Sequence, residues 1–422
     1  MTDEAADLEA TLLREHPAAA RSMSALGRTL AFPRGIPFQA AQARGTSINA
    51  TLGQLTDDRG HPLPLPAVSR GLVGLDPRQT FLYAPIEGPA ALREAWLARQ
   101  RRLAGEPSVA VSSPFVTHGL THGLSLLADL FVDEETEVVL PSPCWENYDL
   151  LFTMRSGARI VPYSPWADSS FDAGRLAAAL ATVRGKALVI LNFPSNPTGW
   201  WPDPGHARAL VDVLVAHPGP LVVVTDDAYQ GFVYEEGLHD RSLFWDLAER
   251  ADPERQLIVK CDGATKELVF FSSRVGFLTH TATGEAERVI TDKLKTLVRG
   301  SVGSASGPAL SLVAAALADP RSDDAFEDRR QLMAGRYRAL RRALKNLDPE
   351  RIRAWPFNAA YFAFLELGEG LDAEVVRRRL LEEHSTGAIA FPDQRALRVA
   401  YCSLDEKRIP ALVEALDKAA RP

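Results

Sequence analysis

The sequence has few cysteines: Cys144, Cys261 and Cys402 are the only three in 422 residues. So small and odd a set does not make a disulfide framework, and a reducing compartment is favoured. Long apolar runs are also lacking, because none approaches the roughly 18 to 20 residues that a membrane-spanning helix needs. The first residues, MTDEAADLEATLLREHPAAA, are acidic and amphipathic, unlike a signal peptide. We therefore expect a cytoplasmic protein without a membrane partner.

An excess of positive charge is absent too. The chain has 47 Lys and Arg residues against 54 Asp and Glu residues, which gives a net charge of −7. Nucleic-acid binding leaves a basic footprint on a domain, so we expect no nucleic-acid partner. What remains is ordinary globular composition, with 46% hydrophobic and 24% charged residues. The length suffices for two or three domain-sized units and a large core.

From about residue 90, helical segments alternate with short apolar strands. Strands are expected at 113–119, 137–143, 187–194, 221–229, 256–263 and 275–280. Continuous Val, Ile and Leu runs between helices are typical of a mostly parallel sheet covered on both faces, so the pattern predicts an α/β fold. After Arg299, long helices and then alternating strands and helices predict a smaller α+β domain, with Pro320 near the boundary.

The region before residue 90 is less regular. We expect one helix over the first 20 or so residues, followed by an irregular crossing over residues 31–54, where Pro and Gly interrupt the pattern.

Four segments stand at the ends of expected strands. The first, NFPSNPTGWWP, follows an apolar strand, and its turn residues can fix the Asn196 amide; a simple loop is the alternative. In the second, VVVTDDAYQGF, Asp226 ends a buried strand and needs a cation or several donors. For its neighbour, Asp227, we expect a solvated acid.

The third segment, CDGATKELVFFSSRVGFL, has Lys266 on the edge of an apolar run and Arg274 shortly after. Lysine is rarely buried, so its position is unusual. The fourth, VTHGLTHGLSLLADLF, is a strand, a glycine turn and a helix start, whose backbone N–H groups can bind an anion. His118 and His122 stand four residues apart, but no third ligand is placed beside them, and we expect no metal site.

Taken together and in this order, the four segments resemble the fold type I pyridoxal-5′-phosphate (PLP) enzymes, specifically the class I/II aminotransferases of the aspartate and aromatic type. The resemblance extends from Ile48 to about Leu412. It implies a large domain with a mostly parallel seven-stranded sheet flanked by helices, plus a smaller α+β domain. The domains would be residues 55–318 and 319–422, with an N-terminal segment, residues 1–54, packing with the small domain.

The resemblance also implies an activity and roles for particular residues. The enzyme would be a PLP-dependent aminotransferase that moves an amino group between an L-amino acid and a 2-oxo acid by a ping-pong mechanism, with 2-oxoglutarate and glutamate as one pair. Lys266 looks like the lysine that forms the Schiff base with PLP and then moves the proton. Asp226 resembles the partner of the pyridine nitrogen. Asn196 and Tyr229 resemble the pair that hydrogen-bonds the 3′-oxygen of the cofactor.

The phosphate and ring contacts follow from the same resemblance. Arg274 looks like the phosphate-binding arginine, whose fork suits a dianion. The contacts of the glycine turn would come from Gly119, Leu120 and Thr121. Trp145, in PSPCWENY, matches the aromatic residue that stacks on the ring.

Two positions depart from the family pattern. Gly263 stands where members often carry a phosphate-binding serine, and Thr265 is the candidate that would compensate. Tyr148 stands where aspartate aminotransferases carry a histidine behind the aspartate. A tyrosine can still donate a hydrogen bond there.

The substrate residues are also implied by the resemblance. Arg398, in ALRVAYCSL, matches the arginine that binds the α-carboxylate, and Gly53 resembles a glycine that contacts the substrate. Arg299 resembles the arginine that binds a distal carboxylate across a dimer, although the proline pair that usually follows is missing; a helix-end arginine favoured by the dipole is the alternative. Asn358 is a further candidate pocket residue.

A homodimer with shared active sites is implied by one more segment, FLYAPIEGPAALREAW. Its Tyr83 would reach the phosphate of the neighbouring subunit's cofactor. The alternative is an interfacial tyrosine without a ligand contact.

Other reactions remain open at this point. A β-lyase, a decarboxylase or an oxidase of the same fold would share Lys266, Asp226 and Arg274. The choice among them depends on which Cα bond lies perpendicular to the cofactor ring. A PLP-binding transcription regulator would carry a basic N-terminal helix-turn-helix domain, and only about 45 residues precede the resemblance. A scaffold without activity would be expected to lack the lysine.

Overall fold

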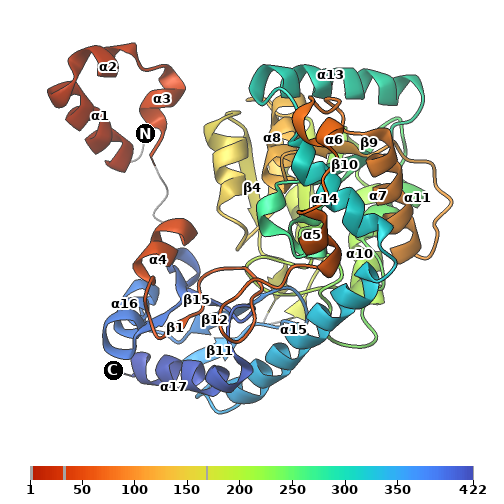
Figure 1. The fold of residues 1–422 in the computed structure, drawn as a ribbon. Coiled ribbons are helices and arrows are strands. Elements are labelled where there is room, and N and C mark those ends of the chain that lie inside the picture. Colours follow the sequence, from red (N-terminus) through yellow and green to blue (C-terminus); the bar gives the residue numbers. More distant parts are fainter. Residues whose placement is uncertain (1–2, 32–34, 168–169, 422) are drawn as a thin grey trace.

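A seven-stranded sheet forms the centre of the computed structural model, which describes residues 3–31, 35–167 and 170–421 (Figure 1). In spatial order its strands are β2 (Phe115–Thr117), β10 (Gly276–His280), β9 (Gln256–Gly263), β8 (Leu221–Asp226), β7 (Ala187–Asn192), β3 (Glu137–Pro141) and β4 (Arg159–Tyr163). Strand β10 runs antiparallel to both of its neighbours, and the other neighbouring pairs are parallel. The predicted mostly parallel seven-stranded sheet is confirmed.

Both faces of this sheet are covered by helices, which explains why its strands are continuously apolar. On β7, Leu188 packs in the same core as α8 (Leu120–Phe131), while Val189 packs on the opposite face against α10 (Pro204–Val215). Helix α13 (Glu285–Ser301) packs outside α8, and α11 (Leu243–Arg250) lies against β8 and β9. In α7 (Ala90–Leu103), Trp96 stacks on Phe277 of β10 with ring centroids 4.3 Å apart. Helix α9 (Gly174–Leu180) covers β4.

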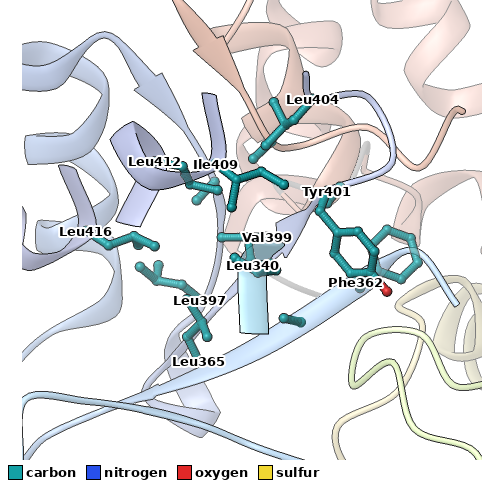
Figure 2. Packing of buried hydrophobic residues seen from close by; sticks show 14 of the residues in the cluster. Leu340, Phe362, Leu365, Leu397, Val399, Tyr401, Leu404, Ile409, Leu412 and Leu416 are labelled. Carbon is teal, nitrogen blue, oxygen red and sulfur yellow. The ribbon is translucent and has the colours of Figure 1, made fainter. Parts of the chain in front are cut away.

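A second, antiparallel sheet lies toward the C-terminus. Its strands, in order, are β11 (Ile352–Ala354), β12 (Phe362–Leu367), β15 (Ala396–Ala400) and β14 (Ile389–Phe391). It packs with α15 (Ser322–Leu344), α16 (Ala373–His384) and α17 (Ile409–Ala419). Figure 2 shows the core between them, where Leu340 of α15 and Leu412 of α17 lie around Val399. This α+β unit matches the expectation.

The N-terminal region differs from the prediction in two ways. Instead of one helix there are three, α1 (Asp3–Glu15), α2 (Pro17–Ser22) and α3 (Ala25–Thr29), which stand apart from both sheets (Figure 1). The break comes at Pro17, whose missing N–H is tolerated in the first turn of a helix but not in its middle.

The stretch expected to be irregular contains two regular elements. Helix α4 (Ile36–Gln42) lies beside β14, and β1 (Ile48–Asn49) pairs in parallel with β13 (Thr386–Gly387). The prediction was therefore wrong over these residues. Residues 32–34 of that stretch lie outside the described part of the chain.

Three further helices, α5 (Pro66–Gly71), α6 (Pro77–Phe81) and α14 (Gly307–Ala318), pack together near α7. Within the described residues, no helix is both long and apolar enough to cross a membrane. The three cysteines are all free thiols.

Candidate functional site

A cavity of about 230 Å³ opens at the carboxyl ends of β7, β8 and β9. This is the edge at which open α/β sheets bind ligands. The cavity is lined by Leu120, Thr121, Trp145, Tyr148, Asn192, Asn196, Asp226, Ala228, Tyr229, Thr265, Lys266 and Arg274. Most of the residues singled out in the sequence therefore lie together, although they come from five separate stretches of the chain.

Asp226 is the acid of this cavity. It ends β8 with 3% of its surface exposed, and its Oδ2 accepts a hydrogen bond of 2.6 Å from the Tyr148 hydroxyl. Burial raises the pKa of the carboxyl to about 6, while the Tyr148 hydrogen bond and the charge of Lys266 act in the opposite direction. Asp226 is consequently ionised in most molecules at neutral pH. Tyr148 thus supplies a donor behind the aspartate, as the sequence allowed.

Lys266 lies in the short helix α12 (Ala264–Glu267), which directly follows β9. Its Nζ stands 4.9 Å from the centroid of the Tyr229 ring. Burial lowers the pKa of the amine to about 8; the Asp226 charge opposes this shift and the Arg274 charge adds to it. An amine with this pKa is neutral in an appreciable share of molecules near neutral pH, and the neutral amine is the nucleophile.

A second group of residues at this cavity suits an anion. Gly119, at the start of α8, has a φ of 80°, and a Cβ there would come 2.6 Å from Nη2 of Arg274. Glycine is therefore required both for the turn and for the close approach of the guanidinium. The first N–H groups of α8, at Leu120 and Thr121, have no acceptor within the helix. Thr265 adds a buried hydroxyl that has no hydrogen-bond partner. A guanidinium, helix N–H groups and hydroxyls suit a phosphate.

Gly263 has a packing reason of its own. A Cβ at this position would lie 2.6 Å from the backbone oxygen of Val275 and 2.8 Å from Cα of Gly276. Those are backbone atoms of the adjoining strand, so a serine could be accommodated only if β9 and β10 moved apart. Thr265 is the neighbouring hydroxyl that lines the cavity.

Arg398 connects the second sheet to the cavity. It lies on β15 with 2% of its surface exposed and donates from Nη1 to Oδ1 of Asn196 (3.0 Å) and from Nη2 to the backbone oxygen of Thr51 (2.8 Å). Its Nε is buried without a partner, and its guanidinium stands 4.3 Å from the Phe362 ring centroid. A Cβ on Gly53 would come 2.8 Å from that same ring. Burial lowers the pKa of Arg398 to about 10, so the side chain remains a cation at neutral pH.

Tyr83 and Arg299 do not line this cavity. The surface of Tyr83 is 98% exposed and borders a separate hollow of about 260 Å³ beside α14. Arg299 is exposed in the last turn of α13.

Two expectations about polar residues were wrong. Asn358 does not face the cavity: its amide exchanges two hydrogen bonds, of 2.8 and 2.9 Å, with the backbone of Trp201. Asp227 is not solvated: it is 2% exposed, accepts a hydrogen bond of 2.6 Å from Ser242 and lies 2.9 Å from Nζ of Lys260. A buried lysine on the neighbouring strand, which the sequence pattern did not reveal, removes the need for solvent.

One polar lining residue was missed. Asn192 ends β7, donates to the backbone oxygen of Asp226 (3.1 Å) and accepts from the N–H of Asn196 (2.8 Å). It thereby joins the ends of two strands. Its signal was a single polar residue closing the apolar run ALVIL, the same signal that identified Asp226.

The two histidines are held by local contacts. The His118 N–H donates to Nδ1 of His122 (3.0 Å), and burial lowers the pKa of His122 to about 4. The described stretches of the chain hold no group of three or more His, Cys, Asp or Glu residues placed to bind a metal ion.

Comparison with known proteins adds to this geometry. Residues 46–416 match the sequence model of a family described as aminotransferase class I and II. The probable N-succinyldiaminopimelate aminotransferase DapC of Mycobacterium tuberculosis is 32% identical over 206 residues, which are 48% of this chain and 50% of that protein. The chain thus spans about half the length of that relative. The aspartate aminotransferase of Pyrococcus horikoshii is 24% identical over 340 residues, covering 78% of this chain and 81% of the relative.

Solved structures share the fold. The crystal structure of an aminotransferase from Anaerococcus prevotii superposes with a TM-score of 0.82 over 95% of this chain and 100% of its own, at 19% sequence identity.

Proposed function

The chain belongs to the aminotransferase class I and II family, and from this premise we propose that it is a PLP-dependent transaminase acting on an L-amino acid and a 2-oxo acid. The observation that supports the proposal most is the pairing of two titratable groups in one cavity. Lys266 has a pKa lowered to about 8, and Asp226 has a pKa raised to about 6. Opposed shifts of this kind concentrate at catalytic sites.

The cavity fits the cofactor on its own geometry. The anion end has a guanidinium from Arg274, the N-terminus of α8 and the unpartnered Thr265 hydroxyl, which suit the phosphate. The other end has the Asp226 carboxylate, which suits a protonated pyridine nitrogen. Trp145 lines the same cavity. Bound PLP supplies an aldehyde that condenses with primary amines and a ring that withdraws electrons from the substrate Cα.

Each of the chain's own residues would then have a distinct role. Asp226, hydrogen-bonded by Tyr148, holds the proton on the ring nitrogen. Lys266 Nζ would accept the Cα proton of the amino acid and deliver a proton to the cofactor that receives the amino group, which its lowered pKa permits near neutral pH. Asn196 and Tyr229, which line the same cavity, would hydrogen-bond the 3′-oxygen.

Arg398 is proposed to hold the α-carboxylate that all substrates share. Its Nε is the buried donor without a partner, and Asn196 and Thr51 fix the rest of the guanidinium. A carboxylate is the natural acceptor for such a fork. Gly53 would leave room for the substrate beside the Phe362 ring.

We propose glutamate and 2-oxoglutarate as one substrate pair, with Arg299 of a second subunit reading the distal carboxylate. Arg299 is exposed at the end of α13, which leaves it accessible to another copy. A relative named aspartate aminotransferase acts, by its name, on a dicarboxylic amino acid.

A homodimer with shared sites is part of the same proposal. An apolar patch is exposed beside α5 and α6, with Leu72, Val73, Phe81, Leu82 and Tyr83 exposed by 63 to 98%. Contiguous exposed apolar side chains of this kind mark interaction surfaces. Burying the patch in a dimer would bring Tyr83 to the phosphate end of the neighbouring cavity.

The domain boundaries at residues 54 and 318 also remain proposals. They agree with the pairing of Ile48 and Asn49 with Thr386 and Gly387, and with the bond from the Ala400 N–H to the Ala50 oxygen (2.8 Å). These contacts join the N-terminal segment to the C-terminal sheet.

A half-reaction screen tests the proposed function. PLP-loaded protein is mixed with each amino acid in turn, and the visible absorbance of the bound cofactor is followed. We expect glutamate to bleach the band and 2-oxoglutarate to restore it. One amino group per active site should be transferred in each half-reaction. If no amino acid bleaches the band, or if bleaching yields CO2, ammonia or H2O2 instead, transamination is rejected.

A further inference from the structure

A second charged cluster lies behind the cavity, on the other face of the sheet. At its centre is Lys260 of β9, which is 1% exposed. Its Nζ is 2.6 Å from Oδ2 of Asp262 and 2.9 Å from Oδ2 of Asp227. The cluster is closed by neutral donors: Trp96 Nε1 donates to Asp262 (3.0 Å) and Ser242 to Asp227 (2.6 Å).

The strand register explains why Asp226 and Lys260 face opposite sides of the sheet. Asp226 pairs with Cys261, and Thr225 pairs with Lys260. Because side chains alternate along a strand, Asp226 points to the cavity face and Lys260 to the other. The cluster is nevertheless close to Asp226 along the chain, because Asp227 is the next residue.

Lys266 likewise has a buried acid as its neighbour in the chain. Glu267 directly follows Lys266, is 1% exposed, and accepts hydrogen bonds from Arg99 (2.7 Å) and Gln100 (2.9 Å). Its Oε1 has no partner. Arg99 also reaches Asp323 of α15, at 3.7 Å.

Negative charge is in excess in this region. Three buried acids, Asp227, Asp262 and Glu267, face two buried cations, Lys260 and Arg99. Burial raises the pKa of Asp262, and it raises the pKa of Glu267 to about 7, while the charge of Lys260 acts against both shifts. Lys260 therefore limits the negative field that this cluster exerts on its surroundings.

Stability alone is a weak explanation for such a cluster. Buried ion pairs are costly to desolvate, and well-packed apolar residues of similar volume are often as stable. We propose that Lys260 is a positioning residue for the proposed reaction, on which this inference rests. Its ammonium offsets one of the two buried negative charges of Asp227 and Asp262, and so sets the protonation balance of Asp226 and Lys266 across the sheet.

The sign of the effect follows from Coulomb's law. Removing the Lys260 charge leaves a more negative field, which favours the protonated form of the nearby nitrogen groups in the cavity. Removing one acid does the reverse. A charge change in this buried cluster, at an effective dielectric constant of about 20, is expected to shift such a titration by about one pH unit.

The experiment measures the pH midpoint at which the visible absorbance of the PLP-loaded protein changes. We expect Lys260→Met to raise the midpoint by about one unit and Asp262→Asn to lower it by a similar amount. The double variant removes one charge of each sign and should return the midpoint to within a few tenths of a unit of the wild type. Lys260→Arg keeps the charge and should also stay close to the wild type.

A purely structural role predicts another result. All variants would then lose melting temperature, but their midpoints would coincide with that of the wild type, which overturns the inference. If Lys260→Met does not fold, Asp262→Asn decides, because an unchanged or raised midpoint contradicts the proposal. Failure of the proposed function is distinguishable, because the wild type would then either give no visible band with PLP or give a band and fail the half-reaction screen, whereas the midpoints are measured without substrate.

Discussion

The two faces of β8 and β9 differ in whether their buried polar groups have partners. On the cavity face, buried polar atoms lack partners, as at Thr265 Oγ1 and Arg398 Nε. On the far face, Lys260 is held between two carboxylates at 2.6 and 2.9 Å, although Oε1 of the nearby Glu267 has no partner. A buried polar group without a partner costs free energy, whereas a paired one is largely compensated. The cavity face is therefore the one arranged to receive a ligand, and the far face is arranged to hold charge in place.

The difference between the two faces is clearest at two neighbouring acids of β8 and the loop after it. Asp226 and Asp227 are adjacent and almost equally buried, at 3% and 2% exposure. Only Asp227 has a cation within ion-pair distance. Asp226 has the Tyr148 hydroxyl and the Ala228 N–H (3.3 Å) as donors, and it lines the cavity. Burial by itself does not separate a structural acid from a catalytic one; the partners do.

The largest effect is expected when the cavity face loses its amine. Lys266→Ala should reduce the turnover of every substrate by about 10,000-fold, because it removes both the nucleophile and the group that moves the Cα proton. Steady-state kinetics with PLP in excess would measure it. Lys186→Ala, at an exposed lysine paired with Asp133 (2.6 Å), is the matched control and should be active. Comparable turnover in both variants would contradict the assignment.

The second largest effect is expected for the Arg398→Ala variant. It should lower kcat/KM for all amino acids by about 100-fold, mainly through KM, because the α-carboxylate loses its buried cation. The control is Arg336→Ala, which removes another buried arginine, paired with Asp58 at 2.9 Å. That variant should lower the melting temperature and leave KM unchanged. The role of Arg398 is refuted if KM stays at the wild-type value.

Tyr148→Phe should cost about tenfold in kcat/KM, the usual effect of one hydrogen bond to a charged group. The Tyr148 bond lowers the pKa of Asp226, so its loss should raise that pKa above about 6. The acid limb of the pH profile, where activity appears as Asp226 ionises, should accordingly move to higher pH. Tyr163→Phe is the control, because that buried hydroxyl has no partner; its profile should match the wild type.

The last effect, similar in size but confined to one class of substrate, concerns a residue on neither face. Arg299→Ala should lower kcat/KM for glutamate by about tenfold relative to that for a neutral amino acid, if the partner subunit supplies this arginine. Arg288→Ala, on the same helix but paired with Glu285 at 2.9 Å, should leave the ratio unchanged. Equal losses for both substrates in the Arg299 variant would reject the role.

Much of the fold was predictable because its signals are local. The continuous apolar strands and the polar residues that close them identified the sheet edge and Asp226. The short strand β4, RIVPY, was missed because an arginine and a proline among its five residues leave no continuous apolar run. Helix α4 was missed because the flanking glycines and prolines obscured a short helical stretch, whose stability comes from packing beside β14.

The site was predictable in its residues and less so in its contacts. The motif segments pointed to Lys266, Arg274 and Arg398; the first two line one cavity, and Arg398 bonds Asn196, which also lines it. Sequence spacing did not reveal that Asn358 holds the Trp201 backbone, nor that Lys260 pairs with Asp227. Both contacts join residues from different strands or loops, and periodicity within one segment carries no information about the segment beside it.

The amino-acid sequence by itself determined the parallel sheet and its order of motifs, because strand composition and turn chemistry are written in neighbouring residues. Only the tertiary structure decided which buried charges are paired and which are left open. Asp226 and Asp227 look alike in the chain, and they differ because the fold brings a tyrosine to one and a lysine to the other. Charge compensation is a property of three-dimensional neighbours, and it separates the cavity face of this protein from the face behind it.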